Sequence, residues 1–190
     1  MLAAATGARR SELVALRWRD VDLSDGTVRI ERGVVMGPAG LVEKDTKTHA
    51  ARRVALDAGT VHIVGAHQVR MTARAAMCRA ELTDDSFVFS NAGDCSDPWF
   101  PDSVSRGFKR LCIAEGIPDV RLHDLRHFVA SQLLSAGVDI RTVAGRLGHR
   151  NAATTLNVYA HFLEQADRGA ADVIGRVIAA EPDDVGRRGR

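Results

Sequence analysis

The stretch HDLRHFVASQLLSAGVDIRTVAGRLGH, residues 123–149, has the most regular pattern in the chain. Its first part places side chains on one helical face, at Leu125, Phe128, Val129, Gln132 and Leu133. Gly137 follows this run and can adopt the left-handed conformation that ends a helix. Asp139 can then cap a second, short helix that ends at Leu147-Gly148. The pattern therefore predicts a helix over 123–136 followed closely by a shorter one.

Between residues 21 and 56 the pattern changes to short β-prone runs, namely VDL, TVRIER, LVEKD and RRVAL. They are separated by turn-forming segments, Ser24-Asp25-Gly26, Gly37-Pro38 and residues 46–50. This alternation predicts one small antiparallel sheet. Residues 87–89 can form a further short extended segment.

Helical patterns account for most of the remaining chain. Residues 7–16 begin as a helix, because Leu13 and Leu16 are three apart and Glu12 is near the N-terminal end. Four further helices are expected, from Asp57 to about Ala80, over Pro101–Glu115, over about 152–162 and over about 164–180. The expected fold class is mainly α with a small antiparallel β-sheet (α+β).

Length and composition fit one domain. Of the 190 residues 45% are apolar and only 5% aromatic, so the core must consist mainly of Ala, Leu, Val and Ile. We expect this domain over 1–180 and a polar, charged, disordered tail over 181–190. Arg outnumbers Lys strongly, which suits binding to phosphate groups. A genome that favours Arg codons explains the same bias, so composition leaves DNA binding undecided.

The cysteines Cys78, Cys95 and Cys112 are far apart and form no C-x-x-C pair. Neither a disulfide framework nor a zinc site is expected, and a reducing cytoplasm is the simplest location. No apolar run approaches the roughly 20 residues of a membrane span. The first ten residues do not have the pattern of a signal peptide. We expect a cytoplasmic protein without metal, cofactor or membrane contact.

Chemically capable side chains stand at the ends of the expected elements. His123 and Arg126 are three apart at a helix start, hence on one face. His149 ends a helix, and Tyr159, the only tyrosine, follows ten residues later. Two basic residues complete the set, Arg9 at a helix N-terminus and Lys47 in a turn between strands.

Each of these residues, taken alone, has an ordinary explanation. Arg9 and Lys47 can be surface charges, and His149 can interact with the last carbonyl groups of its helix. Tyr159 can be a half-buried packing residue with a solvated hydroxyl. A single H-x-x-R pattern occurs often by chance. The residues become informative only in combination.

In combination they resemble one family, the tyrosine recombinases or phage-type integrases. The resemblance extends from Thr6 to about Phe162 in four blocks that keep the family's order: TGARRSEL (6–13), TKTHAARRVAL (46–56), HDLRH (123–127) and LGHRNAATTLNVYAH (147–161). The last two blocks are the most specific, because order, spacing and helix placement agree. The resemblance implies the catalytic-domain fold of this family, the DNA breaking-rejoining enzyme fold. It also implies a site-specific recombinase that cleaves and rejoins DNA through a covalent 3′-phosphotyrosine intermediate.

The resemblance assigns four positions to the scissile phosphate. Arg9, His123 and Arg126 would hold its non-bridging oxygens, and His149 would help to bind it and to stabilise the growing charge. Negative charge develops on these oxygens during cleavage, so fixed cations aimed at them lower the barrier. Arginine suits this role because it stays protonated and can bind two oxygens at once.

Three further positions receive roles from the same resemblance. Tyr159 would be the nucleophile, and a phenol with a pKa of about 10 needs positive charge or a base nearby to attack at neutral pH. Lys47 would be the general acid that protonates the departing 5′-oxygen. Glu12 would orient Arg9 without contacting DNA.

The resemblance also implies partners, namely double-stranded DNA, a homotetramer on that DNA in a synaptic complex, and accessory DNA-bending proteins. The expected location is the nucleoid, and a phage or another mobile element is the expected source. The resemblance implies a helical DNA-binding clamp domain ahead of the catalytic one, and we expect residues 1–190 to lack it. An excised domain, a truncated or decayed gene and a natural short form all explain this. Residues 163–180 can pack on their own core or on a neighbouring protomer.

Two other functions remain open at the level of sequence. A type IB topoisomerase uses a similar set of arginine, lysine, histidine and tyrosine but relaxes supercoils without exchanging strands. The spacing of His149 and Tyr159 favours the recombinase. A non-catalytic DNA-binding remnant would act by occupancy alone, which the complete set of catalytic residue types argues against.

Overall fold

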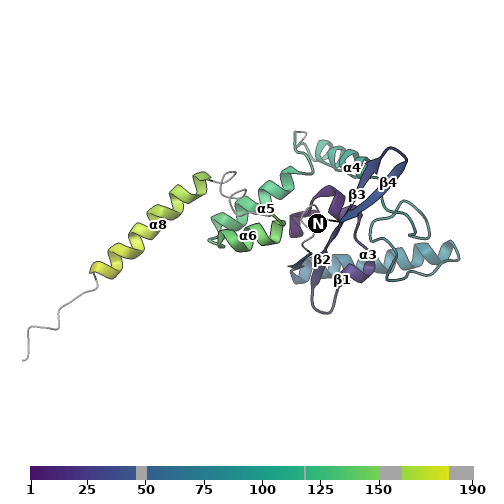
Figure 1. The fold of residues 1–190 in the computed structure, drawn as a ribbon, viewed down its shortest axis with the longest axis horizontal. Coiled ribbons are helices and arrows are strands. Elements are labelled where there is room, and N and C mark those ends of the chain that lie inside the picture. Colours follow the sequence, from purple (N-terminus) through teal and green to yellow (C-terminus); the bar gives the residue numbers. More distant parts are fainter. Residues whose placement is uncertain (46–50, 118, 150–159, 180–190) are drawn as a thin grey trace, which may run out of the picture.

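The computed structural model describes residues 1–45, 51–117, 119–149 and 160–179, with backbone only at residues 45 and 160–169. Its helices are α1 (Leu2–Thr6), α2 (Arg10–Val14), α3 (Ala58–Met77), α4 (Pro101–Ala114), α5 (Asp124–Ser135), α6 (Ile140–Leu147) and α8 (Ala160–Ala179), with a 3-10 turn η1 at Trp18–Asp20. Its strands are β1 (Val21–Asp22), β2 (Thr27–Ile30), β3 (Arg32–Gly37), β4 (Gly40–Asp45) and β5 (Arg52–Ala55). The expected α+β class, mostly helical with small antiparallel sheets, is what these elements form (Figure 1).

The strands form two sheets and not the single sheet that the sequence predicted. One has the order β1-β2-β5, and the other is the β3-β4 hairpin, with antiparallel pairing throughout. The β3 segment was not predicted as a separate strand. It separates from β2 because its Val34 packs with Val14 and Ala15 of the α2 region, whereas Val28 and Ile30 of β2 pack in a different cluster. The two sheets thus pack into two different hydrophobic clusters.

The predicted helix caps of α3 and α6 are confirmed. The Asp57 carboxylate accepts a hydrogen bond from the Thr60 backbone N–H at the start of α3. Asp139 does the same at the start of α6 for residues 141 and 142. Gly148 ends α6 with a φ of 68°, in the left-handed region. These caps fix where α6 ends, and therefore where the following residue, His149, is placed.

The predicted break between two C-terminal helices is wrong. Residues 160–179 form one uninterrupted helix, α8, which passes through the expected boundary at 163. The physical reason is local, since the segment from 160 to 167 contains neither glycine nor proline to end a helix. Most of the helix expected over 152–162 and the tail over 181–190 lie outside the described residues. Within the described residues, no helix is both long and apolar enough to cross a bilayer.

The N-terminal segment joins the C-terminal helices to the rest of the fold. Figure 1 shows this segment, in purple, between the α5–α6 pair and the strands. Arg126 of α5 donates from Nη1 to the Gly7 carbonyl at 2.6 Å, and Arg146 of α6 donates from Nη2 to the Ala5 carbonyl at 2.6 Å. Two buried or partly buried guanidinium groups thus satisfy carbonyls at the end of α1, which would otherwise lack partners. The contact brings the start of α2 next to α5 and α6.

Gly7 is the residue that permits this contact. Its φ is 62°, and a Cβ added there would lie 2.6 Å from Cδ2 of Leu147 and 3.6 Å from Cγ1 of Val129. Both the left-handed backbone and the missing side chain are needed, because Leu147 is part of the buried cluster under α5 and α6.

We predict that Gly7→Ala lowers the free energy of unfolding by about 1–3 kcal/mol, from backbone strain plus displacement of Leu147. Urea unfolding followed by circular dichroism measures it. The matched control is Gly107→Ala in α4, where a Cβ meets nothing within 4 Å. There the change should be neutral or stabilising by up to about 1 kcal/mol. Equal effects at both glycines would contradict the close approach of α1 to α6.

Candidate active site

A buried carboxylate, that of Glu12, lies between two arginines at the start of α2. Only 3% of Glu12 is exposed. Arg9 donates to it twice, from the backbone N–H at 2.8 Å and from Nη1 at 2.9 Å. Arg52 of β5 donates from Nη1 at 3.1 Å and from Nη2 at 2.6 Å. Burial by itself would raise the pKa of Glu12, but hydrogen bonds and charge from Arg52, assisted by Arg9, hold that pKa below its usual value.

Arg9 connects this cluster to the end of α6. Its side chain is 42% exposed, and its Nη2 donates to the Gly148 carbonyl at 3.4 Å. Arg126 enters the same region from the first turn of α5 and is only 4% exposed. The sequence predicted that Arg9 and Arg126 would lie together. The structure places the Arg9 guanidinium against the turn that precedes His149, and Arg126 is close enough for its charge to lower the pKa of His149.

His149 lies among these cations as an imidazole that resists protonation. Its backbone N–H donates to the Ala144 carbonyl at 3.0 Å, which fixes the residue directly after α6. Burial, followed by the positive charges of Arg126 and Arg9, lowers the pKa of His149 to about 4. A neutral imidazole at neutral pH can donate a hydrogen bond to an anion without adding to the repulsion among the cations.

His123 lies at the N-terminal end of α5, next to His127. The two rings meet edge to face, with their centroids 5.1 Å apart. Burial lowers the pKa of His123, and His127 and Arg126 lower it further. The predicted same-face arrangement of His123 and Arg126 therefore places a second imidazole near the cations.

Four of the predicted site residues, Arg9, His123, Arg126 and His149, are thus brought together from three separate segments. Lys47 and Tyr159, the predicted general acid and nucleophile, lie outside the described residues. Glu12 lies where it can orient Arg9, as the sequence suggested.

Sequence reasoning missed Arg52, although the residue stands inside one of the four blocks. A signal was available in the strand alternation of RRVA, because residues 52 and 54 lie on one face of β5. Val54 is fully buried, so Arg52 on the same face points toward the interior, and its side chain is 10% exposed. An arginine on the buried face of a strand needs an acidic partner to compensate its charge, and Glu12 is that partner.

The site has the chemistry of an anion receptor. Two guanidinium groups, those of Arg9 and Arg52, bond to the single carboxylate of Glu12, and the charge of Arg126 also acts on His149, so positive charge remains when both imidazoles are neutral. Such fixed, partly buried positive charge attracts phosphate oxygens. Among the described residues, no group of three or more His, Cys, Asp or Glu side chains is placed to hold a metal ion.

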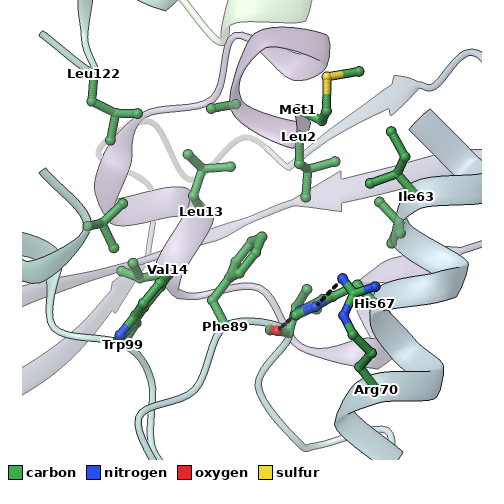
Figure 2. Close-up of a pocket in the computed structure, with 14 residues that line it drawn as sticks. Met1, Leu2, Leu13, Val14, Ile63, His67, Arg70, Phe89, Trp99 and Leu122 are labelled. Carbon is green, nitrogen blue, oxygen red and sulfur yellow. Dashed lines mark hydrogen bonds between the residues drawn. The ribbon is translucent and has the colours of Figure 1, made fainter. Parts of the chain in front are cut away.

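A separate pocket elsewhere in the molecule has different chemistry. Figure 2 shows it between α1, α2 and α3, with mainly apolar side chains around it, including Leu2, Leu13 and Phe89. Its His67 is used within the fold, since Nε2 is 2.7 Å from the Val88 carbonyl oxygen and the ring stacks on Phe89. None of the predicted site residues that the structure describes lines this pocket, so the candidate active site is the cationic cluster.

Comparison with known proteins identifies the family. The model of the phage integrase family matches residues 1–166, and the chain therefore belongs to that family. The integrase of Staphylococcus phage L54a is 31% identical over 173 residues, which covers 87% of this chain and 47% of that protein. A protein named tyrosine recombinase XerC-like from Caldanaerobacter subterraneus subsp. tengcongensis is 25% identical over 188 residues, covering 92% of this chain and 47% of that protein. The chain spans slightly less than half the length of these relatives.

Solved structures share the fold. The Tn1549 transposon integrase, solved in complex with transposon right end DNA, superposes with a TM-score of 0.76 at 19% identity, covering 92% of this chain and 57% of that one. The XerA recombinase gives a TM-score of 0.64 at 24% identity, covering 88% and 55%. The expected fold, that of a tyrosine recombinase catalytic domain, is confirmed.

We predict that His149 titrates near pH 4 in the free protein and at a higher pH when inorganic phosphate is bound, because the anion offsets the charges of Arg126 and Arg9. NMR titration of the histidine ring signals measures this, and His149→Asn assigns the peak. In the unfolded chain this histidine takes up its proton near pH 6.5. Its contribution to stability is therefore complete above about pH 6.5 and is lost as the pH falls toward 4. A value at or above 6.5 in the free protein would contradict the cationic surroundings.

Proposed function

We propose that this chain is the catalytic part of a site-specific DNA recombinase or integrase that cleaves and rejoins strands through a covalent 3′-phosphotyrosine bond at Tyr159. The observation that carries this proposal is the meeting of Arg9, Arg126 and His149, from three distant segments, around one anion-binding region. The family membership supports it, because relatives that match most of this chain are named recombinases and integrases.

The phosphate is held and activated by the described residues. Arg9 and Arg126 bind the two non-bridging oxygens, and their charge opposes the negative charge that grows on these atoms in the transition state. His149 and His123, both held neutral by their surroundings, donate hydrogen bonds to the same group. Since the cations are fixed before DNA binds, little reorganisation is needed during the reaction.

Bond exchange is assigned to the two predicted residues outside the described ranges. The Tyr159 oxygen forms a bond to phosphorus while the bond to the 5′-oxygen breaks, and the phenol proton is lost to solvent or a base. Lys47 supplies a proton to the departing 5′-oxygen. The phosphotyrosine bond conserves the energy of the broken linkage, so a 5′-hydroxyl can reverse the step on the same or another strand.

We assign residues 1–180 to the catalytic domain and 181–190 to a tail. The proposed partners are double-stranded DNA, three further copies of this chain in a synaptic tetramer, and accessory DNA-bending proteins, in the nucleoid of the cytoplasm. Apolar side chains on α8 support assembly, since they are exposed by 49–71% at Val173, Ile174, Val177 and Ile178. Figure 1 shows α8 extending away from α5 and α6.

Basic residues continue from the site along α4. Arg106, Lys109 and Arg110 line one surface hollow, and Lys109 also lines the next one together with Arg121 and His123. This strip gives a DNA backbone a cationic path away from the candidate active site.

We predict that Tyr159→Phe reduces covalent adduct formation at least about 100-fold, because the variant lacks the attacking oxygen. The probe is a pool of duplexes with random sequence around a single nick, and adducts are recovered as SDS-resistant protein–DNA complexes. DNA binding by the variant, measured by fluorescence anisotropy, should equal that of the wild type. Adducts that persist in Tyr159→Phe would refute this nucleophile. Relaxation of plasmids that contain none of the recovered sequences would favour a topoisomerase, and binding without adducts in the wild type would favour a DNA-binding remnant.

We also predict DNA binding that weakens steeply with salt, since phosphate contacts dominate it. Arg106→Ala and Lys109→Ala should each reduce the slope of log K against log salt by about 1, equally for all DNA sequences. Arg29→Ala is the matched control, because Arg29 is exposed but paired with Glu31 at 2.7 Å. If the α4 substitutions leave the slope unchanged, α4 is not part of the DNA-binding surface.

A further inference from the structure

Arg52 makes contacts to two segments that the candidate active site needs. Its Nη1 and Nη2 donate to the two carboxylate oxygens of Glu12, and its Nε donates to the Arg146 carbonyl at 2.9 Å. Its side chain is only 10% exposed. Three of the five N–H donors of the guanidinium therefore point into the protein, which is not how a residue that binds substrate is arranged.

The guanidinium also lies against the turn that carries His149. A Cβ added at Gly148 would lie 2.5 Å from Nη1 and 2.9 Å from Cζ of Arg52. Only a glycine, here with a φ of 68°, allows this approach. The Gly148 carbonyl in turn accepts a hydrogen bond from Nη2 of Arg9 at 3.4 Å. Two arginines thus hold the same turn, and one glutamate joins them.

We propose that Arg52 is a positioning residue for DNA cleavage. It keeps Glu12 ionised and fixes the end of α6, so that Arg9 and His149 are aimed at the same phosphate group. This inference rests on the proposed function. Arg52 itself does not contact DNA and acts entirely through Glu12 and the backbone at residues 146–148.

The geometry requires arginine at this position. A planar guanidinium binds both carboxylate oxygens of Glu12 and still presents Nε to the Arg146 carbonyl. Lysine carries the same charge as a single point on a flexible chain and cannot make this set of bonds. The charge of a lysine at position 52 would keep Glu12 ionised, but Glu12 would no longer hold the Arg9 side chain in a fixed orientation.

The test compares Arg52→Lys and Arg52→Ala with Arg53→Ala, the neighbouring residue on β5, whose side chain is 62% exposed and bonds at the surface with Thr27. The substrate is a nicked duplex recovered from the pool that the wild type traps covalently. A second version carries a methylphosphonate at the cleaved position, so that one charged oxygen is replaced by a neutral methyl group. Adduct formation is measured at saturating DNA.

Both Arg52 variants should form adducts about 10–100-fold more slowly on the phosphate substrate, with DNA affinity within about 2-fold of wild type, since transition-state contacts are lost and ground-state binding is not. On the methylphosphonate the ratio of wild type to variant should shrink to about 3-fold or less, because Arg9 then has less charge to stabilise. Arg53→Ala should match the wild type on both substrates. The double variant Arg52→Lys with Glu12→Gln should form adducts no more slowly than either single variant, because both changes break the same interaction.

Each other outcome overturns a different statement. If both Arg52 variants form adducts at the wild-type rate, Arg52 does not position the site. If they lose rate equally on the two substrates and also melt at a lower temperature, Arg52 serves only the stability of the fold. If Arg52→Ala does not fold, Arg52→Lys decides the question, because it keeps the buried charge. If the wild type forms no adduct with any duplex in the pool, the proposed function fails and this inference fails with it.

Discussion

The candidate active site depends on the ion pairs that the buried carboxylate of Glu12 forms with Arg9 and Arg52. An ionised group that is 3% exposed would cost several kcal/mol without partners. Here four hydrogen bonds from Arg9 and Arg52 surround it. Removing either side chain would leave oxygens of this buried carboxylate without some of their hydrogen bonds, so the start of α2 and strand β5 are held in one arrangement. The end of α6 joins them, because both arginines also donate to its carbonyls.

A second set of bonds places the α5 side of the site. The carbonyls at the end of α1 accept from Arg126 and Arg146, residues more than 110 positions away along the chain. The absence of a side chain at Gly7 lets Leu147 pack directly against this turn. The same arginine, Arg126, therefore contributes both to the joint between the two parts of the fold and to the charge of the site.

The balance of charge explains why the site combines charged arginines with neutral histidines. Arginine remains protonated under all relevant conditions, so a cluster of guanidinium groups supplies a permanent field. That field, together with burial, favours neutral imidazoles, as the lowered pKa values of His149 and His123 indicate. The site can thus offer hydrogen-bond donors of two kinds to one phosphate. The excess positive charge is available to the incoming anion and is not fully neutralised within the protein.

The sequence by itself determined the caps of α3 and α6 and the helix over 124–135, because these depend on neighbours a few positions away. It also suggested His123, Arg126 and His149 as candidate site residues, through the order and spacing of blocks that resemble the tyrosine recombinases. It gave no sign that β3 would form its own hairpin, since that choice depends on which hydrophobic cluster Val34 enters. Only the tertiary structure decided the contacts of Arg52. Its partners, Glu12 and the Arg146 carbonyl, are 40 and 94 positions away, and bonds of that range follow from packing and not from local pattern.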